Sequence, residues 1–361
     1  MKNIKEDLPV SESETQTIAS GNRIFYLDVL RVLSAFGVVW LHVSILYWWR
    51  DNWTFSTEWM ISNVYESCVR WCVPVFVMIS GALFLDSKKN LNIKRLYTKN
   101  VAHILQAYIL WSIIYAFGIT NNFDIISILK NIIKGPFHFW YLKMLIGVYL
   151  VIPVLKAIVS NKQAEVYFLC VAAITCFVIP PLFPIISHMG DSIKAMAEGW
   201  TGLNIMLGYT GYFVLGHFLN TYKFNLRIKR AIYILGGLSI ICVISFTYLI
   251  SVHNGQPSEL FYNYLTPFSL FEAAAVFLLF SQNGNNIPIK YHSVIIHLSK
   301  MSFGIFLVHI LVINIMIKIG INFLAFHPAL FIPCFSFIVF SLSYIITRLL
   351  SHIPYLKILV N

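Results

Sequence analysis

The chain has 361 residues, of which 58% are hydrophobic and only 11% are charged. Soluble domains carry about 25% charged residues, so this composition excludes an ordinary water-soluble protein and indicates an integral membrane protein. The formal net charge of +11 does not indicate nucleic-acid binding, because the basic residues fall mainly in the short breaks between apolar runs, where membrane insertion places them.

The first 22 residues are polar and mixed in charge, without the apolar core of a cleaved signal. We predict a flexible cytoplasmic tail at 1–22, one transmembrane domain at 23–352 and a short cytoplasmic tail at 353–361. Apolar runs of about 20 residues, enough to cross about 30 Å of hydrocarbon, follow one another through the domain. They predict an all-α polytopic fold of about ten transmembrane helices, at residues 25–47, 63–85, 101–120, 139–159, 164–186, 200–220, 231–252, 262–281, 301–321 and 325–349.

The loops predict the orientation, because lysine and arginine are retained on the cytoplasmic side of a membrane. The breaks after the second, fourth and sixth spans are basic and read "DSKKNLNIKRLYTKN", "SNKQAE" and "TYKFNLRIKR". The breaks after the first, fifth and seventh spans read "WRDNWTFSTEWMIS", "SHMGDSIKAMAEGW" and "HNGQPSELFYN". Both termini are therefore expected in the cytoplasm, although the outward loop after the third span contains Lys130 and Lys134.

The first span keeps three polar residues, Asp28, Arg31 and His42. Arg31 and His42 are eleven residues apart, which at 100° per residue places them within about 20° of one helix face and roughly 16 Å apart along the axis. Asp28 lies three residues before Arg31 and can pair with it. An imidazole beyond the middle of a bilayer is costly unless it faces protein or water. This stripe indicates a functional site, and a hydrogen-bonded packing histidine is the alternative.

Other polar residues of the apolar runs have simpler explanations. Glu66 and Arg70 are four residues apart and can pair with one another. Glu272 has no local partner in "PFSLFEAAAVFLLF", so a functional role and a structural one are both open. Cysteines and histidines form no metal-ligand pattern, and no metal is predicted.

Four segments resemble the membrane-bound acyltransferase-3 family. They read "YLDVLRVLSAFGVVWLH", "ESCVRWCVPVFVMISGALFLDSKK", "GPFHFWYLKMLIGVYLVIPVL" and "KMSFGIFLVHILVI". An arginine followed after ten residues by a histidine in a first membrane helix is diagnostic for this family, and Trp140, Tyr141 and His309 match further motifs. The resemblance covers about residues 23–350. It is greatest to the bacterial branch that decorates surface polysaccharides, of the enterobacterial common antigen O-acetyltransferase and intercellular adhesin acyltransferase type.

The resemblance implies transfer of an acyl group, usually acetyl, from cytoplasmic acetyl-CoA to a hydroxyl of a lipid-linked or growing glycan at the outer side of a bacterial cell membrane. His42 is then the expected general base, which takes the hydroxyl proton, and an acyl-histidine intermediate is the alternative. Basic residues at the cytoplasmic side can bind the phosphates of CoA, which is a polyanion. The residues expected there are Arg31, Lys94, Arg95 and Lys99, the last three standing where the family usually has closely spaced arginines.

Supporting or substrate-binding roles are also predicted for a wider set of polar and aromatic residues, comprising Asp28, Glu66, Arg70, Trp140, Tyr141, Lys143, Glu272 and His309. For His309, a helix-packing hydrogen bond is the alternative. The aromatic pair can stack on a sugar ring or belong to an interfacial aromatic belt. Two other functions fit the same composition. Ten helices with charges at mid-membrane also suit a transporter or flippase of glycan or small molecules, and a non-catalytic membrane component of a glycan-synthesis complex is the third hypothesis. No feature of the sequence predicts an oligomeric state.

Overall fold

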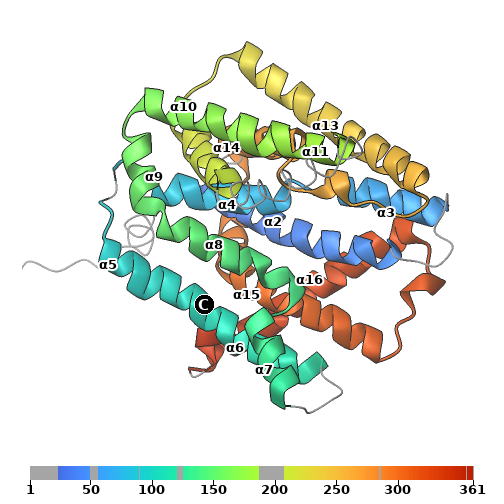
Figure 1. Cartoon of the computed structure of the whole chain (residues 1–361). Coiled ribbons are helices and arrows are strands. Elements are labelled where there is room, and N and C mark those ends of the chain that lie inside the picture. Colours follow the sequence, from blue (N-terminus) through green and yellow to red (C-terminus); the bar gives the residue numbers. More distant parts are fainter. Residues whose placement is uncertain are drawn as a thin grey trace, which may run out of the picture.

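The computed structural model describes residues 23–48, 56–88, 90–119, 125–186, 207–283, 286–354 and 356–360. Within these ranges the chain is helical and has no strand, which confirms the predicted class (Figure 1). Residues 207–221 form one helix. The others are α2 (Phe25–Ser44), α3 (Thr57–Ser67), α4 (Cys72–Phe84), α5 (Ile93–Arg95), α6 (Ala102–Ile119), α7 (Ile125–Lys134), α8 (Trp140–Leu150), α9 (Ile152–Val159), α10 (Lys162–Ala172), α11 (Ile179–Ile186), α13 (Leu226–Asn254), α14 (Pro267–Asn283), α15 (His292–Lys318) and α16 (Pro328–His352).

Among the described residues, eight helical segments are long and apolar enough to cross a membrane, and a bent pair makes a ninth candidate. These nine coincide with nine of the ten predicted spans, so the protein is a multi-pass membrane protein. The sixth predicted span, 200–220, and the predicted tail, 1–22, lie partly or wholly outside the described residues. The eight segments are Phe25–Tyr47, Thr57–Phe84, Ile93–Gly118, Lys162–Phe183, Leu226–Asn254, Leu260–Asn283, Ile289–Lys318 and Pro328–His352.

The fourth predicted span is broken, and the single helix expected over 139–159 was wrong. Its two halves, Phe137–Leu150 and Ile152–Val159, are bent by 57° relative to one another. Pro153 lies in the first turn of the second half. A proline has no N–H to donate to the carbonyl four residues earlier, and its ring clashes with that carbonyl, so a straight helix cannot continue through it.

The three basic loops share one end of the bundle. The Lys156 ammonium, near the end of the fourth span, donates to the Asp86 carbonyl oxygen in the loop after the second span at 3.1 Å. The Lys162 ammonium lies 4.7 Å from the centre of the Tyr222 ring, which joins the loops after the fourth and sixth spans. Figure 1 shows α5 and the α9–α10 turn at this end, and α7 away from it. We call it the basic end.

Helix α2 crosses the bundle from the basic end to the opposite end. At its start the Tyr26 hydroxyl donates to Asn220, at the end of the 207–221 helix. Just beyond its last turn the Tyr47 hydroxyl donates to the Phe323 carbonyl oxygen at 2.7 Å. Between these anchors α2 packs against α4, α14, α15 and α16. His42 therefore lies close to the end opposite the basic loops.

Two glycines let α4 and the 207–221 helix touch backbone to backbone. A Cβ on Gly81 would overlap the carbonyl of Phe213, and a Cβ on Gly216 would overlap the carbonyl of Met78. Small residues at helix contacts are how membrane helices gain close packing without a hydrophobic driving force. This contact fixes α4 within the bundle.

We expect Gly81→Val and Gly216→Val to destabilise the protein by roughly 1–3 kcal/mol or more, because the added methyl groups must push two backbones apart. Thermal unfolding in detergent, followed by circular dichroism, measures the change. Gly237→Val on α13 is the matched control, since a Cβ there meets no atom within 4 Å. Equal melting temperatures for all three variants would contradict this packing.

Candidate active site

The first polar group of α2 is a buried carboxylate with three partners. Arg23 donates to Asp28 through two nitrogens, Nε at 2.6 Å and Nη2 at 2.8 Å. The Ser299 hydroxyl donates to the same carboxylate at 2.6 Å, whereas Arg31 Nη1 is 3.5 Å away. The predicted pairing of Asp28 with Arg31 is therefore present but secondary to Arg23, which the sequence did not single out. Arg31 keeps most of its donors for other contacts.

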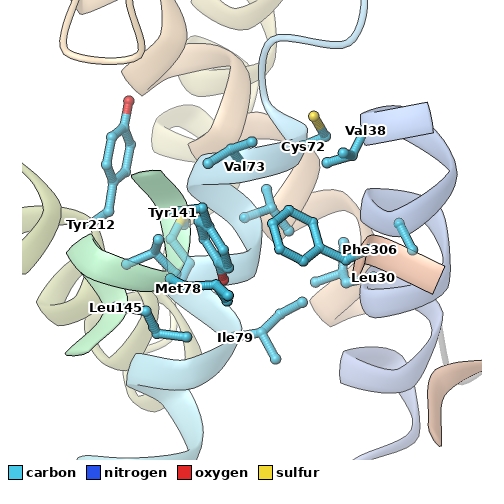
Figure 2. Close-up of a cluster of buried hydrophobic side chains, with 14 of the residues drawn as sticks. Leu30, Val38, Cys72, Val73, Met78, Ile79, Tyr141, Leu145, Tyr212 and Phe306 are labelled. Atoms are coloured by element: carbon cyan, nitrogen blue, oxygen red, sulfur yellow. The ribbon is translucent and has the colours of Figure 1, made fainter. Parts of the chain in front are cut away.

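A cavity of about 180 Å³ opens beside Arg31, between α2, α4, α8 and α15. Along α2 its lining extends from Arg31 to Val38, one turn before His42. Figure 2 shows Tyr141 from α8 and Phe306 from α15 pointing into the same space beside α4, with ring centroids 5.3 Å apart. The other polar groups in the lining are Ser80, Tyr149 and Ser302.

Three histidines from separate segments meet next to this cavity, and we call them the histidine cluster. His42 is in the last turn of α2, His138 is in the short turn η3 (Phe137–Phe139) before α8, and His309 is in α15. The ring centroids are 5.2 Å apart for His42 and His309, 5.4 Å for His138 and His309, and 6.4 Å for His42 and His138. Phe306, which lines the cavity, lies 5.8 Å from His138 and 5.9 Å from His309.

Most ring nitrogens of the cluster are buried without a hydrogen-bond partner in the described structure. These are Nδ1 of His42, Nε2 of His309 and both nitrogens of His138. His309 Nδ1 lies 2.6 Å from the Phe306 carbonyl oxygen. A carbonyl can only accept, so Nδ1 carries the proton and Nε2 of a neutral ring is left as an acceptor. Unpaired polar atoms gathered at one place in a buried core indicate a functional site. No group of His, Cys, Asp and Glu among the described residues has the arrangement of a metal site.

His138 was not among the site residues predicted from the sequence. The residue stands in the quoted segment "GPFHFWYLKM", two positions before Trp140. Its partners in the cluster are 96 or more positions away in the chain, so helical spacing could not reveal them. Gly135, at φ +68°, and Pro136 form the turn that brings His138 into the bundle.

The predicted pair of Glu66 and Arg70 forms across the break between α3 and α4, and both residues are buried. Arg70 also donates to the Tyr262 carbonyl oxygen at 3.0 Å and lies over the Tyr262 ring at 4.1 Å. Glu272, which is 1% exposed, has two carboxylate oxygens without a hydrogen-bond partner in the described structure. The ion pair therefore gives a structural reason for burying Glu66 and Arg70. No hydrogen bond in the described structure gives such a reason for Glu272.

The residues that start α8 face two sides. Tyr141 is buried and lines the cavity. Trp140 turns the other way, with its ring centroid 5.7 Å from those of Tyr264 and Tyr209. Lys143 is exposed, and its ammonium donates to the Lys134 carbonyl oxygen at 3.3 Å. Trp140 and Tyr141 therefore lie on different surfaces of the same helix.

The basic residues expected to bind the acyl donor lie at the basic end. Lys94, Arg95 and Lys99 are exposed where α5 leads through the π-helical stretch Leu96–Val101 into α6. None of the three side chains forms a salt bridge within the described residues. The structure does not place them against Arg31, so a ligand would have to span the two positions.

A multi-pass helical bundle that holds proton-accepting rings next to an internal cavity is built like a membrane-embedded enzyme. The family model described as an acyltransferase domain matches residues 24–348, and the chain belongs to the acyltransferase-3 family. The protein is therefore a membrane acyltransferase, which confirms the family that its motifs predicted. No curated protein and no solved structure matched the chain.

We expect Arg23→Gln to lower the melting temperature more than Arg31→Gln, because Arg23 supplies the bidentate contact to Asp28 and bidentate contacts are the stronger kind. Thermal unfolding in detergent at low and high salt measures the two effects. A larger loss for Arg31→Gln would contradict the assignment of Arg23 as the main partner of this buried carboxylate.

Proposed function

We propose that the protein takes an acyl group, acetyl in the simplest case, from acyl-CoA at the basic end and transfers it to a hydroxyl of a cell-surface or lipid-linked glycan at the opposite end. The basic end faces the cytoplasm, and the membrane is the cell membrane of a bacterium. One observation carries the proposal. The histidine cluster stands next to a cavity whose lining extends along α2 from Arg31 towards His42.

The donor would enter from the basic end. CoA is a polyanion with a long flexible pantetheine arm, and Lys94, Arg95 and Lys99 offer exposed positive charge to its nucleotide. Arg31 lies further in, where a guanidinium can bind a phosphate or the thioester oxygen through charge-assisted hydrogen bonds. Along α2, Arg31 and His42 are roughly 16 Å apart. The pantetheine arm is the part of the donor that would cover this distance.

The chemistry follows from a neutral His42. Its Nε2 takes the proton of the acceptor hydroxyl while the hydroxyl oxygen attacks the thioester carbonyl. The tetrahedral intermediate then breaks its carbon–sulfur bond, and the departing thiolate takes the proton back from His42. The products are the acyl ester and CoA with a free thiol. His138, with both ring nitrogens unpaired, offers a hydrogen bond to the acceptor.

His309 would hold His42 in the required tautomer. The unpaired Nδ1 of His42 and the unpaired Nε2 of His309 belong to rings 5.2 Å apart. Because Nδ1 of His309 is already bound to the Phe306 carbonyl, its Nε2 can accept from Nδ1–H of His42. That bond leaves the lone pair of His42 on Nε2, which is the arrangement of a base and its orienting partner. His309 is a positioning residue in this mechanism.

We expect His42→Ala to leave the protein inserted and able to bind acyl-CoA, while transfer falls by about 10²–10⁴ because the general base is lost. Proteoliposomes of defined orientation receive acetyl-CoA at the basic end and cell-surface glycan on either side. Free CoA thiol and acylated glycan are then measured.

Arg31→Gln is the contrasting variant, since it should raise the KM for acetyl-CoA more than it lowers kcat. Near-normal transfer by His42→Ala would remove His42 from catalysis. Transfer only to glycan at the basic end would overturn the transmembrane route.

The positioning role of His309 gives a separate expectation. His309→Leu should lower kcat by roughly 10–10²-fold with little change in the KM for acetyl-CoA, because an orienting partner is lost while donor binding is kept. His309→Gln places an amide near the former Nε2 and should restore most of kcat. A purely structural role predicts equal loss in both variants, accompanied by a lower melting temperature.

A further inference from the structure

A second, larger cavity of about 760 Å³ lies on the other surface of α8, between α8, α9, α10 and the 207–221 helix. We call it the α8 groove. One face of the broken span lines it from end to end. The positions recur with the three- and four-residue spacing of a helix face, at Trp140, Lys143, Met144, Gly147, Val148 and Val151, and the lining continues on α9 with Val154, Leu155 and Ile158.

The two ends of the α8 groove differ in chemistry. At the end next to the histidine cluster, Trp140 packs against Tyr209, and Lys143 and Asn263 also line the space. Towards the basic end, the lining is aliphatic and aromatic, with Ile158 and Phe168. The α8 and α9 segments measure roughly 28 Å along their two helix axes, and the 57° bend between them makes the direct distance shorter.

We propose that the α8 groove binds the chain of a polyisoprenyl phosphate that carries the acceptor sugar. The phosphate lies at Lys143, and the first sugar lies at Trp140. This inference rests on the proposed function, because it names the carrier of the glycan that the histidine cluster acylates.

Three observations favour this occupant. Among the described residues of the lining, a lysine is the one charged residue, which suits a phosphate. The Lys143 ammonium has three N–H donors, and one of them binds the Lys134 carbonyl oxygen. A single groove along one helix face suits one chain, whereas a membrane phospholipid brings two.

The position of the polar end connects the groove to the chemistry. Trp140 and Tyr141 are neighbours at the start of α8. Trp140 lines the α8 groove, and Tyr141 lines the cavity of about 180 Å³ beside Arg31, which we call the donor cavity. His138 precedes them by two and three residues. A sugar bound at Trp140 would therefore need to extend only past the first turn of α8 for one of its hydroxyls to reach the histidine cluster. Its lipid chain would remain in the α8 groove, on the other surface of the helix.

Gly147 provides the test, because it lines the groove and a Cβ built there meets no atom within 4 Å. Gly147→Phe should fill the groove without disturbing a neighbour. The purified full-length protein is labelled with a photoreactive polyisoprenyl phosphate, and the labelled peptide is identified. We expect labelling in α8 or α9 of the wild type and roughly tenfold weaker labelling of Gly147→Phe, because the phenyl ring occupies the space of the chain and a steric penalty of about 1.4 kcal/mol already lowers affinity tenfold.

Gly237→Phe on α13 is the matched control, because Gly237 is also exposed with open space around its Cβ and should label like the wild type. Lys143→Gln should weaken labelling by the phosphate probe and leave labelling by an uncharged polyisoprenol probe unchanged. Competition by phosphatidylglycerol as effective as by unlabelled polyisoprenyl phosphate would overturn the proposal, as would equal labelling of both glycine variants.

Photolabelling does not require acyl transfer, so the experiment can reject the lipid site and the proposed function independently of one another. A wild type that acylates soluble glycan but is not labelled in α8 or α9 overturns the lipid site alone. A wild type that is labelled there and releases no CoA thiol with any glycan supports the lipid site and overturns the proposed function.

Discussion

A polar side chain inside an apolar helical bundle has no water to bind, so it must find a partner in the protein or remain unsatisfied at a cost. This constraint separates the buried polar residues of this protein into two groups. Asp28 and Glu66 have arginine partners, and Glu165 has His217 at 2.7 Å. The histidine cluster, by contrast, keeps unpaired nitrogens at the far end of α2. The paired groups stabilise the bundle, whereas the unpaired nitrogens of the histidine cluster are available for chemistry.

The bend in the fourth span shapes the α8 groove, which is lined by both halves of the span. A straight helix across the membrane would place one continuous face against one neighbour. Because Pro153 breaks the span, α9 turns by 57° and the α8 groove follows both halves around the corner. The donor cavity lies on the opposite surface of the same helix. Under the proposed mechanism, donor and acceptor lipid are thus kept apart along their length and meet only where α8 begins.

Local sequence patterns predicted much of the fold and part of the candidate site. The features that they missed depend mainly on contacts between residues far apart in the chain. The length of the apolar runs predicted the spans, and the helical period placed Arg31 and His42 on one stripe. Glu66 and Arg70 pair as their spacing predicts. Arg23 was missed because it precedes the helix and reaches Asp28 over five residues, which is not a helical spacing. His138 was missed because its partners come from α2 and α15, and no local pattern encodes such a meeting. The bend had a local signal in Pro153, but the length of the run favoured one helix.

The distribution of buried charge also distinguishes transfer from transport. A carrier that moves a polar solute needs polar groups along a path that opens to each side in turn. Here α2 has Ser34 and otherwise mainly apolar residues between Arg31 and His42, and the cavity beside it is about 180 Å³, below the several hundred Å³ typical of small-molecule sites. A cavity of this size can admit the narrow pantetheine arm of CoA more readily than a sugar. Under the proposed mechanism, the thioester is extended to a stationary base, so neither the nucleotide nor the glycan has to cross the membrane.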